Sequence, residues 1–292
     1  MDNMGGSAPP PPPPPPDGGM GGMGGGPGSF APMALGDILS KAFELYRDNA
    51  AKLIQLIAVV VVPLALVQAF LVRVVVKPCE ATEVKTFEDL SKLVDRCTGG
   101  FGRSLLIGAL SYFVAVLIQQ LILGALTHGA AGALVGRPVD VSSSYRYALS
   151  RLGGLFLLAL LIGLVVGAGF FLLIIGALIF AVFLSMATPA FIIEHKGVTE
   201  SMSRSWNLVS GSWWHVFGVI VVASIIAGVV SGILTAIAGS SNFFLYWIFS
   251  TIGLLLTAPF VALVGVVLYV DLRARREGLD AAKLQAELDQ PA

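Results

Sequence analysis

The chain has 292 residues, of which 56% are hydrophobic and 12% are charged, and its mean hydropathy is +0.85. A soluble domain carries about 25% charged residues, so this composition is typical of a protein whose solvent is lipid. The 18 basic residues balance the 18 acidic ones. Nucleic-acid-binding domains need clustered basic charge, so that class is excluded and we expect no nucleic-acid partner.

The chain begins with a low-complexity segment. Eight consecutive prolines, Pro9 to Pro16, precede a run of glycine and methionine. Proline enforces an extended conformation and glycine multiplies the states of the unfolded chain, so we predict a disordered tail over residues 1–33. A solubilising role is favoured over that of a proline-rich ligand, because such ligands usually carry a flanking basic residue. The segment lacks the basic and apolar regions of a signal peptide.

Long intervals without charge locate the membrane spans, because a charge at the bilayer centre costs at least about 2.5 kcal/mol and a crossing helix needs about 20 apolar residues. The intervals 53–72 and 104–136 hold one span each. The interval 152–193 is twice as long as one crossing, and we expect a turn at Gly176. The interval 205–270 breaks at "AGSSNFF". Residues 34–275 are therefore predicted to form a domain with six spans, at about 53–74, 104–126, 154–174, 177–193, 214–237 and 246–270.

Lysine and arginine predict the orientation of these spans. With the N-terminus in the cytoplasm, two of the three outer connections carry no basic residue, and the third, at 73–103, also carries five acidic residues. We therefore expect a multi-pass protein of the bacterial cytoplasmic membrane. Both termini, including a C-terminal tail at 276–292, are expected in the cytoplasm.

The outer loop at 73–103 holds the only two cysteines of the chain, Cys79 and Cys97. They lie near the two membrane ends of a polar segment, where an outer location permits oxidation. We predict a disulfide, which closes a ring of nineteen residues and stabilises the fold by about 3 kcal/mol; the alternative is two unpaired thiols. The loop has no histidine to complete a zinc site, and we expect neither a metal nor a cofactor.

Three segments that precede predicted pairs of spans share one apolar pattern. They start at Leu35, Val141 and Val198, and each places apolar side chains at offsets 0, 4, 7, 8 and 11, except for Ser205 in the third. These offsets mark one face of a helix, so we predict three amphipathic helices in the cytoplasmic interface, each followed by a hairpin of two spans. The pattern matches residue type and not identity, so a true repeat and three independent helices both stay open.

Aromatic residues gather on or after two of these helices. Amphipathic rings are enriched at the depth of the lipid headgroups. We therefore interpret five aromatic residues as interfacial anchors: Phe43, Tyr46, Trp206, Trp213 and Trp214.

Few polar groups are available for chemistry at membrane depth. Gln119 and Gln120 lie inside the second predicted span, where they either bind neighbouring helices or line a polar pathway. Catalysis by His215 would need a carboxylate or nucleophile held against it, and the nearby Glu200 and Ser212 show no established spacing. No protease, esterase or phosphate-loop motif is present, so we assign no catalytic, cofactor-binding or metal residue.

Small residues predict close helix packing. Gly163 and Gly167 form a GxxxG pair in the third span, and Ser224, Gly228 and Gly232 continue the pattern in the fifth, so we expect these two spans to form the bundle interior. Prolines inside apolar runs predict helix bends, which some transporters use at binding sites. These prolines are Pro63, Pro189 and Pro259.

Three stretches, "LGDILSKAFELYRDNAAKLIQL", "SWNLVSGSWWHVFG" and "TAPFVALVGVVLYVDLRARREGLD", resemble a group of bacterial membrane proteins. The group is the glycerophosphoryl diester phosphodiesterase membrane domain together with related domains of unknown function. The likeness covers about residues 34–285, and "YVDLRARREGLD" is its most specific part. In those proteins the membrane region adjoins a soluble phosphodiesterase barrel. We expect no barrel here, and the resemblance implies no catalytic residue.

The predicted fold is all-α, with six transmembrane helices, three interfacial helices and a disordered N-terminal tail. We expect a non-enzymatic accessory or scaffold protein in membrane lipid or envelope physiology. Its expected partners are membrane lipids, and a membrane protein or a second copy of the chain. The alternatives are a transporter or channel that uses Gln119 and Gln120, and a phosphodiesterase that uses His215.

Overall fold

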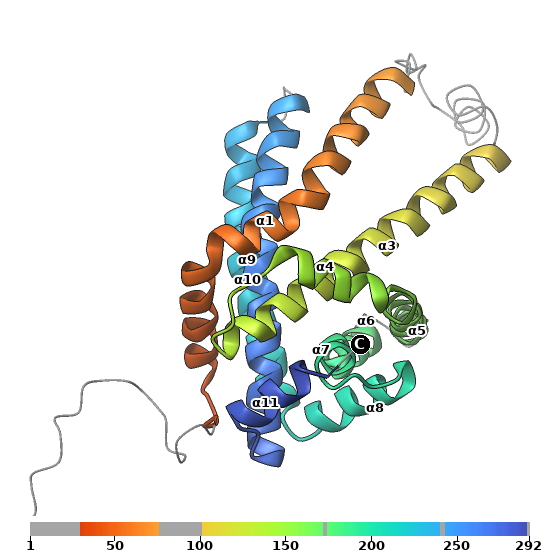
Figure 1. Ribbon diagram of the computed structural model, residues 1–292. Coiled ribbons are helices and arrows are strands. Elements are labelled where there is room, and N and C mark those ends of the chain that lie inside the picture. Colours follow the sequence, from red (N-terminus) through yellow and green to blue (C-terminus); the bar gives the residue numbers. More distant parts are fainter. Residues whose placement is uncertain (1–29, 76–100, 172–173, 240–242, 291–292) are drawn as a thin grey trace, which may run out of the picture.

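The computed structural model describes residues 30–75, 101–171, 174–239 and 243–290, and every regular element in these ranges is a helix. Long helices form three pairs that diverge from one end of the molecule (Figure 1). The pairs are α1 (Leu35–Val75) with α3 (Phe101–Leu134), α5 (Leu152–Phe171) with α6 (Ile174–Leu184), and α9 (Trp213–Ala238) with α10 (Phe243–Glu277). The shorter helices are α4 (Val141–Ser150), α7 (Ala187–Ile193), α8 (Val198–Val209) and α11 (Ala281–Leu288).

We call the end from which the pairs diverge the hub; it consists of the four shorter helices and the adjoining ends of the long helices. Near the hub the long helices are buried, as from Leu263 to Ala274 of α10. Farther out they expose large apolar side chains, such as Leu110 of α3, Phe170 of α5 and Ile233 of α9. An exposed apolar surface of this extent indicates a membrane or protein contact.

Five segments of the described residues are long and apolar enough to cross a membrane: Tyr112–Leu134, Leu152–Phe170, Ile175–Ile193, Trp213–Ala238 and Phe244–Glu277. They correspond to the second to sixth predicted spans, and they indicate membrane association. The first predicted span, 53–74, falls on α1, which is not among the five. The diverging pairs also replace the single bundle that the sequence predicted.

The turn predicted at Gly176 is wrong. α5 ends at Phe171 and α6 begins at Ile174, so Gly176 lies inside α6. A Cβ added to Gly169 of α5 would lie 3.0 Å from the backbone carbon of Gly176 and 2.7 Å from the Phe180 ring. Gly169 therefore permits the close approach of α5 to α6 at Gly176.

The small-residue patterns do not mark the interior of the protein. A Cβ added to Gly163, Gly167, Gly228 or Gly232 would meet nothing within 4 Å. The third and fifth predicted spans, which carry these glycines, are each only 17% buried, whereas the fourth and sixth are 44% buried. The prediction is wrong because the core is built from larger side chains around α10.

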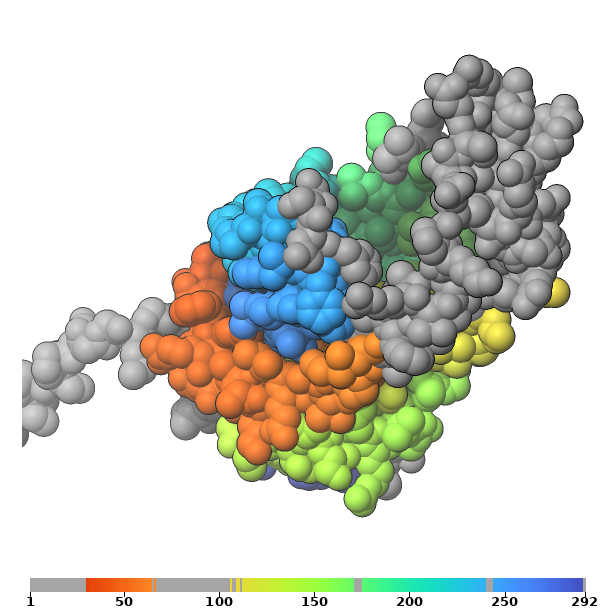
Figure 2. Space-filling model, turned by 90° about the horizontal axis from the view of Figure 1, so that it is seen from above, coloured from red at the N-terminus to blue at the C-terminus, as the bar shows by residue number. Residues whose placement is uncertain are grey.

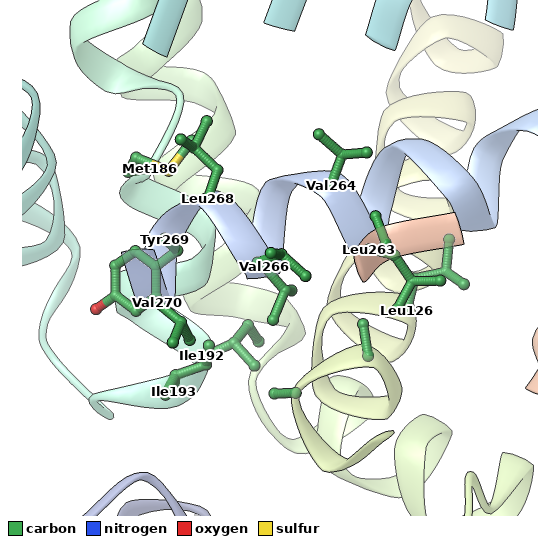
Figure 3. Close-up of a cluster of buried hydrophobic side chains, with 14 of the residues drawn as sticks. Leu126, Met186, Ile192, Ile193, Leu263, Val264, Val266, Leu268, Tyr269 and Val270 are labelled. Carbon is green, nitrogen blue, oxygen red and sulfur yellow. The ribbon is translucent and has the colours of Figure 1, made fainter. Parts of the chain in front are cut away.

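The inner half of α10 is the centre of the core. Figure 3 shows its Leu268 and Tyr269 among side chains from the α6–α7 region, including Met186 and Ile192, and Leu126 of α3 beside the same helix. Lipid tails are as apolar as these side chains, so removal from water cannot by itself drive their association inside a membrane. Close packing around α10 must therefore supply much of the stability.

The three segments predicted to be amphipathic are helical, and they bury equivalent positions. The first forms the start of α1, and the others are α4 and α8. Counted from Leu35, Val141 and Val198, the residues at offsets 3 and 7 are buried in each segment. The next residue, at offset 8, has a large apolar side chain that is exposed; the exposed fractions are 59% for Phe43, 56% for Leu149 and 39% for Trp206. The face turned to the protein is therefore shifted by about one position from the face that the apolar pattern predicted.

Ser205 of α8, the exception in that pattern, joins α8 to a broken helix. α6 ends at Leu184 and α7 begins at Ala187, with Pro189 in the first turn of α7, where a helix tolerates proline. The Ser205 hydroxyl donates to Phe183 O (2.6 Å) and accepts from Met186 N–H (3.0 Å). It therefore satisfies two backbone groups at the break.

We predict that Ser205→Ala lowers the free energy of unfolding by about 1–3 kcal/mol, because it leaves buried backbone groups without partners. Equilibrium unfolding in detergent micelles, followed by circular dichroism, measures this change. Ser203→Ala is the matched control, since Ser203 is exposed on the same helix. Equal stability of the two variants would contradict the role assigned to Ser205.

Candidate functional site

A cavity of about 920 Å³ lies beside α10, between the diverging pairs. Its wall on α10 extends from Trp247 to Leu268, which at 1.5 Å per residue is about 31 Å and close to the thickness of the hydrocarbon core. The other walls come from α1, α3, α9 and the region of α6 and α7. The cavity is thus elongated in the direction of a predicted span.

The lining of this cavity is apolar apart from hydroxyl groups, one amide and the indole N–H of Trp247. Among the described residues, its lining includes no Asp, Glu, Lys, Arg or His. Most of the hydroxyls donate to a carbonyl of their own helix, as Thr127 does to Leu123 O (2.8 Å) and Thr257 to Gly253 O (2.8 Å). These donors are already used, so the cavity suits a largely apolar molecule better than an ion.

The structure separates the two glutamines of the second predicted span. Gln119 lines the cavity and makes no hydrogen bond with the described residues, whereas Gln120 is not part of the lining. Gln119 is therefore the one side-chain amide that lines this space from the described residues.

A buried network of charges holds the hub together. Arg273 of α10 is 2% exposed, and it donates to both carboxylate oxygens of Glu287 in α11, at 2.6 and 2.8 Å. Its Nε lies 3.4 Å from an oxygen of Glu277 and 3.4 Å from an oxygen of Glu194. The arginine therefore connects α10, α11 and the end of α7.

Arg204 of α8 extends this network. Its Nε donates to both oxygens of Glu194, at 2.9 and 3.0 Å, and its Nη1 pairs with Glu277. The Tyr269 hydroxyl also donates to Glu194. Because each buried charge has an opposite partner, the network satisfies the requirement for burial of ions.

A second buried carboxylate joins the two ends of the helical domain. Asp271 of α10 is fully buried and accepts hydrogen bonds from the Met33 backbone N–H (2.6 Å) and from Arg275 Nε (2.8 Å). Arg275 also donates to the Met33 carbonyl, and Phe30 N–H donates to Leu279 O (3.4 Å). Residues 30–33, which the sequence assigned to the disordered tail, are thus held against α10.

Asp271 is also the carboxylate that lies nearest to His215, for which the sequence showed no carboxylate partner. His215 Nε2 lies 3.3 Å from Asp271 Oδ2, but it has no partner in hydrogen-bond geometry. That oxygen also accepts from Arg275, and no hydroxyl among the described residues hydrogen-bonds to His215. The contact therefore lacks the nucleophile and the alignment of a catalytic pair.

The other two histidines lie together at the edge of the hub. His128 stacks on Tyr147 with ring centroids 4.5 Å apart, and His195 meets the edge of the same ring at 5.7 Å. Burial, and then the nearby Arg151 charge, lowers the pKa of His195. Its ring nitrogens have no hydrogen-bond partner among the described residues, so a neutral imidazole is favoured here.

The predicted anchors differ in their surroundings. Trp214 is 77% exposed and Phe43 is 59% exposed, so both rings lie at the surface of the protein. Trp213 stacks on Phe217 (5.0 Å), Trp206 stacks on Phe183 (4.1 Å), and Tyr46 meets the edge of the Phe260 ring (6.5 Å).

The anchors also lie at different levels of the structure. Phe43 and Tyr46 line a groove with Ile226 of α9, about 18 Å farther along that helix than Trp214. The predicted disulfide partners Cys79 and Cys97 lie outside the described residues.

No local pattern in the sequence marks the residues of the charged network, because their partners are distant in the chain. Tyr269 lies 75 residues from Glu194, and Asp271 lies 238 residues from Met33. The available signal was "YVDLRARREGLD", where the structure now places Tyr269, Asp271 and Arg273.

We predict that Arg273→Gln lowers the free energy of unfolding by about 3–5 kcal/mol, because it removes the counter-charge of Glu287 and one of the counter-charges of Glu194 and Glu277. Arg276→Gln, three positions along at an exposed site, is the control and should change it by less than about 0.5 kcal/mol. Unfolding in detergent micelles measures both. Similar values for the two variants would show that the network does not hold the hub.

The sequence also matches a protein-family model. A family of unknown function, DUF7544, matches residues 5–276, while no curated protein and no solved structure matches. The match supports the resemblance to domains of unknown function. It gives no support for the resemblance to the glycerophosphoryl diester phosphodiesterase membrane domain. Its range includes all three pairs of long helices and the buried charges of α10. The chain belongs to DUF7544, a family of unknown function.

Proposed function

We propose that this protein crosses the bacterial cytoplasmic membrane six times and binds lipid between its diverging helix pairs, as a non-enzymatic accessory or scaffold in membrane lipid or envelope physiology. The observation that carries the proposal is the 920 Å³ cavity, about as long as a bilayer is thick and lined without ionisable side chains in the described residues.

The count of six rests on the contact between Met33 and Asp271. This contact places the start of α1 beside the end of α10, at one end of the molecule (Figure 1). A chain that enters and leaves on one side of a membrane crosses it an even number of times. If all five apolar segments cross, a sixth crossing is needed, and α1, with 41 residues, is long enough to supply it.

The hub is the side that we place in the cytoplasm. It carries Arg204, Arg273, Arg275 and Arg276, in agreement with the excess of basic residues expected on the inner side. The three pairs diverge, so each crosses the bilayer at its own tilt, and lipid fills the space between them.

A lipid chain explains the cavity better than a polar solute does. Five of the seven hydroxyl groups in the lining donate to backbone carbonyls; Ser250 and Thr251, for example, both donate to the carbonyl of Trp247 (2.9 and 2.8 Å). An acyl chain needs no donors and fills apolar walls. An accessory or scaffold role follows from binding without a reactive group.

Filling the cavity should displace lipid. Gly265 lines the cavity, and a Cβ added there meets nothing within 4 Å, so Gly265→Leu should reduce co-purifying lipid several-fold without unfolding the protein. Gly228→Leu on α9 is the control, since that site is equally open and lies outside the cavity. Mass spectrometry of lipid bound to detergent-purified protein measures the effect. Unchanged lipid in Gly265→Leu, or equal loss in both variants, would contradict the proposal.

A transporter or channel is the second candidate, and the free amide of Gln119 in the cavity favours it. If a small polar solute crosses here, Gln119→Leu should lower its flux into proteoliposomes about tenfold, while Gln120→Leu, one position away and outside the lining, should not. Flux of a panel of small solutes is the measurement. No flux in the unmodified protein, or equal effects of both substitutions, would exclude this role for Gln119.

A further inference from the structure

Another cavity, of about 620 Å³, lies between α1 and α4 and is lined by both basic and apolar side chains. The basic ones are Lys52 and Arg146, and the large apolar ones include Val59, Val60 and Leu149. Lys52 and Val59 are separated along α1 by about 10 Å. Beyond Lys52 the helix continues into the first predicted span, so along α1 the lining passes from charged to apolar in the direction of the membrane.

The two cations of this groove, Lys52 and Arg146, form no close ion pair with the described residues. One carboxylate, Asp140, also lines the groove. It caps the N-terminus of α4 by accepting from the Ser143 N–H (2.8 Å), so it is already engaged. Two cations and one anion leave the groove with a formal charge of +1.

The apolar part of the lining is open and its walls are fixed. Val59 is 52% exposed and Leu149 is 56% exposed. The Tyr145 hydroxyl donates to Leu56 O (2.5 Å), which holds α4 against α1. Figure 2 shows α1 in orange and α4 in light green side by side on one face of the molecule. The groove therefore exists before any ligand arrives, which lowers the cost of binding.

We infer that this groove binds an anionic phospholipid, with Lys52 and Arg146 on the headgroup phosphate and an acyl chain along Val59 and Leu149. A free phosphate would use the cations and leave the apolar side chains exposed, whereas a neutral lipid would leave the cations unpaired. The inference rests on the proposed membrane location of α1, and it names a lipid class for a site separate from the large cavity.

The test uses the full chain in nanodiscs of phosphatidylcholine, with short-chain phosphatidylglycerol, short-chain phosphatidylcholine and inorganic phosphate as probes. Native mass spectrometry measures the bound probe. We expect phosphatidylglycerol to bind more tightly than the other two. Lys52→Gln and Arg146→Gln should each weaken it about fivefold. Arg47→Gln, on the same helix and outside the groove lining, is the control and should leave binding unchanged.

Three outcomes would overturn the inference: equal binding of both lipids, equal competition by inorganic phosphate, or a preference that survives the loss of both cations. Gly265→Leu distinguishes this inference from the proposed function. It should retain the preference for phosphatidylglycerol, because Gly265 does not line the groove between α1 and α4. Lipid bound without charge preference would refute only this inference, whereas no bound lipid at all would refute the proposed function as well.

Discussion

The hydrogen bonds between Met33 and the α10 residues Asp271 and Arg275 constrain the whole structure. They join the start of the first long helix to the end of the last one, so both must lie on one side of any membrane that the helices cross. The chain can satisfy this only by pairing its crossings. In the proposed topology the three diverging pairs supply these crossings, and the shorter helices lie where the pairs meet (Figure 1).

The charges at the hub act with this constraint. Arg204, Arg273 and Glu194 are held by several partners each, from α7, α8, α10 and α11. A buried ion pair is weak evidence for net stability, because removing ions from water costs about as much as their attraction returns. Removing one partner of a buried ion pair is strongly destabilising, however, because the other charge stays buried without a partner. The network therefore favours the one arrangement in which these helix ends meet. Packing around α10 then supplies the apolar contacts.

The sequence predicted helices and their approximate places well, since long intervals without charge and the recurrent apolar offsets have direct physical causes. The predictions were wrong about which apolar face of a helix packs against the protein. Phe43, Leu149 and Trp206 belong to the apolar faces of their helices, yet they are exposed, and the buried face lies about one position away. In a protein surrounded by lipid, both directions are apolar, so periodicity does not distinguish a core contact from a lipid contact. The same ambiguity misled the prediction from Gly163 and Gly167.

The candidate sites were only partly predictable for a related reason. Gln119 and Gln120 are equivalent by composition, and only the rotation of α3 brings Gln119 to the cavity. The groove between α1 and α4 joins Lys52 to Arg146, which are 94 positions apart in the sequence. The shared buried offsets of α1, α4 and α8 fit both a true repeat and three independent helices, because any helix packed on one face buries positions four residues apart.

The sidedness of the hub tests the central claim most directly. In a chain whose cysteines are replaced by serine, single cysteines at Ser143, Ser203 and Arg276 occupy exposed hub positions. A membrane-impermeant thiol reagent applied to intact spheroplasts should label none of them, and should label all three after lysis. Labelling of one or two of these positions before lysis would place parts of the hub on opposite sides of the membrane and contradict the account.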